Sequence, residues 1–261
     1  MKAVVIALLS LFVMGCVTET TGGFNVEASE DRALQDYLQL SRGYLAQGDL
    51  LNTRRHLNNA INIDDDNSDV HGVWGLLYAR EGDVDLADAS FKRALRIDSS
   101  NSQVRNNYAA FLYSNTRYED AYEQLERVVT DTEYQARPQA FENMGLAALQ
   151  MNELDYAEVA FSRALQLNPN QLRSSLELVN INLMRNNIIQ ARAYYRNFLT
   201  LIQFYSIGQS PRSLWLGIQL ENALGNTDNV YSYGDALREN FSDSVEYQRY
   251  QQLLDDIENN E

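Results

Sequence analysis

Residues 138–170 read PQAFENMGLAALQMNELDYAEVAFSRALQLNPN and contain two helical patterns separated by a short break. In each pattern the apolar residues recur every three or four positions, which is the spacing of one helix face. The break falls at residues 151–153, and Pro169 ends the second pattern because proline lacks a backbone N–H. The stretch therefore predicts two antiparallel helices. We expect two small and two aromatic residues to form the seam between them: Gly145, Ala157, Phe141 and Phe161.

The spacing of these motif residues resembles the tetratricopeptide repeat (TPR), a helix pair of about 34 residues. The small residue at position 145 has counterparts in register at Ser41, Gly75, Ala109, Val179 and Gly217. The intervals between successive positions are 34, 34, 36, 34 and 38 residues. One helix pair cannot bury its own apolar face, so neighbouring repeats are required. We therefore predict an all-α, right-handed superhelical solenoid of about six TPR repeats instead of a non-repetitive bundle.

The predicted solenoid occupies residues 30–261. Its repeats are expected at about 34–67, 68–101, 102–135, 138–171, 172–205 and 210–243. The sixth repeat is degenerate, as terminal repeats are, and residues 245–261 are expected to form a capping helix. Residues 199–211 are apolar and aromatic, and they extend the second helix of the fifth repeat. Their side chains belong either to the core or to a second contact surface.

Composition limits the possible functions. The 261 residues carry a net charge of −15, and an acidic surface repels nucleic-acid phosphates, so DNA and RNA are excluded as main partners. Two histidines and one cysteine leave little material for metal sites or for thiol and imidazole catalysis. We find no phosphate-binding glycine loop, no Ser-His-Asp set and no distinct pair of acid and base. The sequence therefore predicts a protein that is not an enzyme and has no cofactor or metal.

An acidic run at residues 64–69 invites comparison with a calcium loop. It lacks the glycine at position six and the glutamate at position twelve that an EF-hand requires. We read it instead as a turn between repeats, in which Ser68 or Asp69 caps the next helix. His71, on that helix, is expected to be a packing residue and not a metal ligand.

Residues 1–16 read MKAVVIALLSLFVMGC and have the form of an export signal. The apolar run from Ala3 to Met14 is shorter than the ~20 residues that span a bilayer, which favours a cleaved signal. The last four residues resemble a bacterial lipobox, so residues 1–15 are expected to be the signal peptide and Cys16 the lipidation site. Residues 16–29 would form a polar tether. Val17 stands where inner-membrane retention signals often have aspartate, and by that resemblance the destination is the outer membrane.

TPR solenoids curve so that the first helix of each repeat lines a concave groove that binds peptides or helices. Leucine and asparagine dominate the inward positions, which suits an apolar segment whose backbone is held by side-chain amides. The alternative is that several of these leucines belong to the core between repeats. The residues chosen for the groove are Leu38, Arg42, Leu45, Val73, Leu76, Arg80, Asn106, Asn107, Tyr113, Asn143, Leu146 and Asn180. The same register also places Ala110, Leu149, Leu176, Leu183 and Met184 there.

The lipobox, the six repeats and two local stretches together resemble the type IV pilus biogenesis lipoproteins, the pilotins of the pilus secretin. Residues 106–113, NNYAAFLY, look like the family's Asn-Asn-Tyr-Gly-x-Phe-Leu-Cys segment, and residues 191–198, ARAYYRNF, look like its fifth-repeat helix. Ala109 replaces the glycine and Tyr113 replaces the cysteine, so no role of that thiol carries over.

The resemblance implies a non-enzymatic, lipid-anchored monomer at the periplasmic face of the outer membrane. It would bind secretin subunits and promote their localisation and multimerisation. The alternative is a TPR scaffold lipoprotein that tethers cell-wall enzymes or the outer-membrane protein insertion machinery.

Overall fold

The computed structural model describes residues 26–258, which form thirteen α-helices and no strand. The predicted signal, Cys16 and most of the predicted tether lie outside the described residues. None of the described helices is long and apolar enough to cross a membrane. The all-α solenoid expected from the sequence is confirmed.

Twelve of the described helices form six antiparallel pairs, which we number as repeats 1 to 6, and α13 follows them. In each pair the first helix is called helix A and the second helix B. The pairs are α1 (Val26–Ala46) with α2 (Leu50–Ile63), α3 (Ser68–Glu81) with α4 (Val84–Ile97), α5 (Ser102–Ser114) with α6 (Tyr118–Val128), α7 (Arg137–Gln150) with α8 (Leu154–Leu167), α9 (Leu172–Met184) with α10 (Ile188–Phe204), and α11 (Pro211–Ala223) with α12 (Thr227–Phe241), before α13 (Val245–Glu258).

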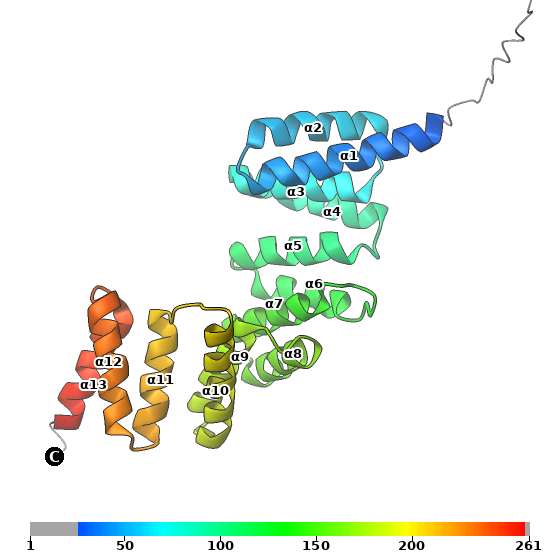
Figure 1. Ribbon diagram of the computed structural model, residues 1–261. Coiled ribbons are helices and arrows are strands. Elements are labelled where there is room, and N and C mark those ends of the chain that lie inside the picture. Colours follow the sequence, from blue (N-terminus) through cyan, green and yellow to red (C-terminus); the bar gives the residue numbers. More distant parts are fainter. Residues whose placement is uncertain (1–25, 259–261) are drawn as a thin grey trace, which may run out of the picture.

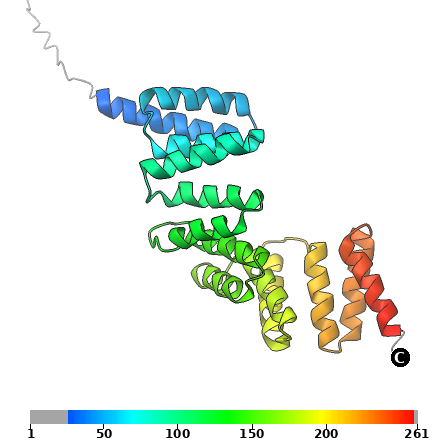
Figure 2. The ribbon, with the colours of Figure 1, turned by 180° about the vertical axis from the view of Figure 1, so that it is seen from behind.

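The repeats stack in sequence order and turn as they stack (Figure 1). Helices α1 to α6 lie across the view, whereas α9 to α13 stand upright in it, and the reverse view shows the same change of direction (Figure 2). Helices α1 and α13 lie at opposite ends of the stack. This arrangement follows from nearest-neighbour packing, in which each repeat is slightly rotated relative to the one before.

A small residue on helix A faces a large residue of helix B sixteen positions later. A Cβ atom added at Gly75 would lie 2.9 Å from the Phe91 ring, and one at Gly145 would lie 2.7 Å from the Phe161 ring. Phe91 and Phe161 are fully buried. The close helix contact expected at Gly145 is therefore confirmed.

The helix starts differ from the sequence expectation in two places. The cap of α3 is Asn67, whose side-chain oxygen accepts hydrogen bonds from the backbone N–H groups of Asp69 and Val70, at 3.0 and 3.2 Å. The expected caps, Ser68 and Asp69, are already helical, because asparagine at 67 takes the extended backbone that a cap needs. Helix α1 begins at Val26, within the segment expected to be tether.

The last helix packs as the expected cap. Tyr250 is buried in a cluster with Leu214, Ile218, Val230 and Leu237 of the sixth repeat. His71 also has the expected packing role, since it is buried and its Nε2 atom lies 2.9 Å from the carbonyl oxygen of Asp65.

Candidate functional site

Four of the residues predicted to line the groove are core residues; Leu176 is one, and the other three lie in repeats 1 and 2. Leu38, Leu45 and Val73 belong to the hydrophobic cluster between repeats 1 and 2, and the exposed fractions of Leu38 and Val73 are 0% and 2%. The buried side chains are inaccessible to a partner, which corrects the expectation for all four. The physical reason is that helix A packs against both its own helix B and the next helix A. Part of its inward face is therefore buried in the contact between repeats.

Several polar groove residues bind one another across repeats. Asn143 Nδ2 donates to Asn106 Oδ1 at 3.3 Å and thereby connects α7 to α5. Arg42 pairs with Asp69 at 3.3 Å and connects α1 to α3. Asn106 is buried, and Asn143 is partly buried. These side chains stabilise the stacking of neighbouring A helices.

The remaining predicted groove residues keep some exposed surface. Arg80 is exposed, and the partly buried members of the set are Leu76, Asn107, Tyr113, Leu146 and Asn180. Of these, only Asn180 also lines the hollow described next.

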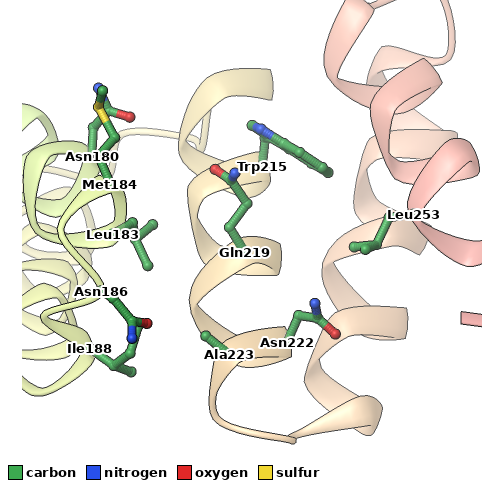
Figure 3. Close-up of a pocket in the computed structure, with 10 residues that line it drawn as sticks. All are labelled: Asn180, Leu183, Met184, Asn186, Ile188, Trp215, Gln219, Asn222, Ala223 and Leu253. Carbon is green, nitrogen blue, oxygen red and sulfur yellow. The ribbon is translucent and has the colours of Figure 1, made fainter. Parts of the chain in front are cut away.

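A hollow of about 360 Å³ lies between the A helices of the last two repeats and the capping helix. Figure 3 shows the α9 residues and Leu253 on opposite sides of α11, with Trp215 extending from α11 toward Leu253. The hollow is lined by Asn180, Leu183, Met184, Asn186, Ile188, Trp215, Gln219, Asn222, Ala223 and Leu253.

The lining of this hollow combines apolar surface with neutral amides. Leu183, Ile188, Trp215 and Leu253 supply apolar walls, and the exposed fraction of the Met184 side chain is 60%. The four amide side chains each carry donors and an acceptor, so they can bind the backbone of an extended or helical segment. No charged residue is part of this lining. The site therefore suits an apolar, uncharged protein segment and adapts to it through the flexible methionine.

The repeat register predicted three of the ten residues that line this hollow. The inward register of the fifth repeat identified Asn180, Leu183 and Met184. It missed the wall supplied by the degenerate sixth repeat and the cap, namely Trp215, Gln219, Asn222 and Leu253. The repeat spacing could have identified this wall, because the 38-residue interval from Val179 to Gly217 places α11 in register with α9.

The apolar segment at residues 199–211 is divided between core and surface. Ile202 is buried in the hydrophobic cluster formed by repeats 5 and 6, and Leu201 is also buried. Phe204, Tyr205 and Ile207 are exposed, Phe204 by 78%, and the rings of Phe204 and Tyr205 meet edge to face. The core alternative therefore holds for Leu201 and Ile202, whereas Phe204, Tyr205 and Ile207 are surface residues.

Two tetratricopeptide-repeat families match parts of the chain, at residues 138–171 and residues 70–101. Over 251 residues the chain is 36% identical to the type IV pilus assembly protein PilF of Pseudomonas aeruginosa, covering 96% of this chain and 98% of that protein. A structure from a functional characterisation of P. aeruginosa PilF aligns with a TM-score of 0.80 at 37% identity, covering 86% of this chain and 99% of that one.

The crystal structure of PilW, described as a widely conserved type IV pilus biogenesis factor, aligns with a TM-score of 0.71 and covers 83% of this chain and 97% of that one. At 24% identity this likeness shows the fold.

The fold and the groove thus define a TPR solenoid protein, a class that acts through protein–protein contacts. The chain belongs to the family of the type IV pilus assembly protein PilF. It is therefore a TPR protein of type IV pilus assembly.

Proposed function

We propose that the protein is an outer-membrane lipoprotein that binds secretin subunits of the type IV pilus and promotes their localisation and multimerisation. The family assignment supports a role in pilus assembly. The lipobox-like sequence ending at Cys16 supports a lipid anchor facing the periplasm. Anchored subunits would reach a high effective concentration, which favours ring assembly.

The observation that carries the binding part of this proposal is the uncharged hollow between α9, α11 and α13. Its apolar walls and amide rim fit an apolar secretin segment. The groove predicted from the sequence also included repeats 1 and 2, but Leu38, Leu45 and Val73 are buried there. The secretin segment is therefore proposed to bind in the last two repeats.

The test compares two substitutions that place a new charge on equally exposed apolar residues. Met184→Glu adds a carboxylate to the hollow, whereas Val159→Glu adds one to α8, outside it; the two side chains are 60% and 61% exposed. Heat-resistant secretin multimers are measured in membrane fractions of strains that carry each variant. We expect Met184→Glu to lower the multimer level severalfold and Val159→Glu to leave it unchanged. Equal multimer levels in both strains would contradict the proposed site.

A deletion strain and a Cys16→Ala strain test the remaining parts. Loss of multimers in the deletion supports the role in assembly. Multimers that form but fractionate away from the outer membrane in Cys16→Ala support the role of the lipid in delivery. Normal multimers at the outer membrane in both strains would contradict the proposed function.

A further inference from the structure

A second hollow, of about 410 Å³, is lined by residues of α4, α5 and α6, at the junction of repeats 2 and 3. Its lining concentrates positive charge in a chain with 36 acidic and 21 basic residues. The charged residues that line it are Lys92, Arg96, Arg105, Arg117, Arg127 and Asp120. Five cations thus gather around one hollow of a protein whose net charge is −15. Solubility does not account for this cluster, because the acidic residues already supply the net charge.

Two of the five cations are neutralised by carboxylates. Lys92 Nζ lies 2.5 Å from Asp88 Oδ2, and Arg117 pairs with Asp88 at 2.8 Å and with Asp120 at 2.6 Å. Among the ion pairs of residues 26–258, none involves Arg96, Arg105 or Arg127. The hollow therefore has about three positive charges without a bonded carboxylate.

Arg105 is the most unusual of these cations because only 6% of it is exposed. Its guanidinium donates to two neutral oxygens, the carbonyl of Ser99 at 2.5 Å and Oε1 of Gln124 at 2.7 Å. Burial lowers the pKa of Arg105, and the charge of Arg127 acts in the same direction, while Asp98 opposes them. A buried cation held only by neutral acceptors is costly unless an anion reaches it.

Anchoring of the turn does not explain why this residue is charged. His71 occupies the same position one repeat earlier and contacts the carbonyl of Asp65, which lies 34 residues before Ser99. An imidazole thus makes the equivalent contact at that junction, and a guanidinium reaches the same carbonyl from helix B, because Arg93 Nη2 donates to Asp65 O at 3.0 Å. The contact from position 71 itself needs no charge, so the charge of Arg105 is additional to this contact.

We propose that this hollow binds a phosphate group. Arginine forks match the oxygens of a phosphate in bidentate geometry, and a phosphate carries enough charge to neutralise several cations at one point. An acidic peptide would instead need cations spread along a stripe, since its carboxylates are spaced along an extended chain. The partly buried Leu95 adds apolar surface for the group that bears the phosphate. The inference is independent of the proposed secretin contact.

The test uses two double variants that remove the same charge from exposed arginines on B helices. Arg96→Gln with Arg127→Gln removes two cations of the hollow, and Arg192→Gln with Arg196→Gln removes two from α10. Inorganic phosphate is titrated into the full-length protein at constant ionic strength, with binding followed by calorimetry. We expect saturable binding that weakens at least tenfold in the first variant and changes less than twofold in the second. Absent binding, or equal binding by all three proteins, would overturn the proposal.

Two further titrations identify the source of the phosphate. Glycerophosphoglycerol, the headgroup of phosphatidylglycerol, represents a lipid diester, and tighter binding of it than of inorganic phosphate would assign the hollow to lipid headgroups. The reverse order would assign it to free phosphate or a phosphate monoester. Hexaglutamate represents an acidic protein segment, and its binding more tightly than both phosphates would overturn the phosphate assignment.

Discussion

At the scale of single residues, one position in every A–B turn has a left-handed backbone. The residues at this position are Gly48, Gly82, Thr116, Asn152, Asn186 and Gly225, with φ between 58° and 86°. Glycine and asparagine tolerate this conformation, whereas a β-branched residue does not. Thr116 is therefore the strained member of the series, and its backbone is held by the N–H of Arg117, which donates to Leu112 O at 3.0 Å.

Replacement of Thr116 by asparagine should stabilise the protein. Relief of the left-handed strain is expected to raise the free energy of unfolding by about 0.5–1 kcal/mol. Asparagine is chosen because this chain already uses it at the equivalent positions 152 and 186. Denaturant titration measures the change, and the reverse substitution Asn152→Thr is the matched control, expected to destabilise by a similar amount. A Thr116→Asn protein no more stable than the original would show that the turn is not strained.

At the scale of helices, the seams of repeats 2, 3 and 4 match a small residue to the size of its partner. Gly75 faces Phe91 and Gly145 faces Phe161, whereas Ala109 belongs to the same cluster as the smaller Leu125. The extra methyl of alanine in repeat 3 is thus accompanied by a smaller side chain opposite it. This pairing explains why Ala109 does not disturb the fold.

This pairing predicts that a smaller residue on helix B compensates for a larger residue on helix A. Gly75→Ala alone places a Cβ 2.9 Å from the Phe91 ring and should destabilise by about 1–3 kcal/mol through overpacking. Phe91→Leu should recover part of that loss, giving a measurable coupling in a double-mutant cycle of unfolding free energies. Gly43→Ala is the control, since its Cβ would meet no atom within 4 Å, and it should be neutral or slightly stabilising. Additive effects of the two seam substitutions would contradict the size matching.

The junctions between repeats use a helix-B position that recurs at residues 54, 88 and 158. Arg54 pairs with Glu81, Asp88 with Arg117, and Glu158 with Arg185, each time reaching the next repeat. The residue at this position is basic in repeat 1 and acidic in repeats 2 and 4, so a search for one repeated residue type cannot find the position. Only the repeat register and the structure together reveal it.

Asp88 gives this junction a pH dependence. Burial alone would raise the pKa of its carboxyl, but hydrogen bonds from Lys92, Tyr108 and Arg117 outweigh burial and hold the pKa below its ordinary value of 3.8. The stabilisation by Asp88 is therefore complete above that value and disappears as the pH falls through the depressed pKa.

Asp88→Asn should accordingly cost about 1–2 kcal/mol of unfolding free energy at pH 7. The difference from the original protein should shrink progressively as the pH falls below about 4, because Asp88 then becomes protonated and loses its charge. Urea titrations at several pH values measure this difference. Asp36→Asn, an exposed aspartate on α1, is the control and should show little effect at any pH. A cost for Asp88→Asn that is the same at pH 7 and pH 3 would exclude the ionic explanation.

At the scale of the whole molecule, the repeat register predicted the number of helix pairs, their order and the cap. The register followed from the 34-residue interval between small residues. This interval is a property of the sequence and can be found without knowing how the solenoid curves. Accessibility of the groove could not be predicted in the same way. Leu38 and Asn180 both occupy inward positions, yet Leu38 is buried and Asn180 lines an open hollow. Which inward residues stay accessible depends on how closely successive A helices approach.

The solenoid architecture predicts that disruption of the cap stays local. Tyr250 is buried, and the backbone of Gly234 approaches its ring so closely that an added Cβ would lie 2.0 Å from it. Tyr250→Ala should lower the local opening free energy of the cap by about 3–5 kcal/mol, since a large buried ring is removed. Because repeats contact only their neighbours, α1 to α8 should keep their stability.

Hydrogen exchange measures this prediction along the chain. Tyr250→Ala should speed amide exchange in α13 and in the parts of α11 and α12 that it covers, and leave α1 to α8 unchanged. Tyr231→Ala is the matched control, because Tyr231 lies on α12 and is 48% exposed. Since Leu253 of α13 forms one wall of the hollow, Tyr250→Ala should also lower the secretin multimer level, which Tyr231→Ala should not. Faster exchange along the entire chain would contradict this prediction. It would show that the solenoid unfolds as one cooperative unit, in which the stability of the first repeats depends on the cap.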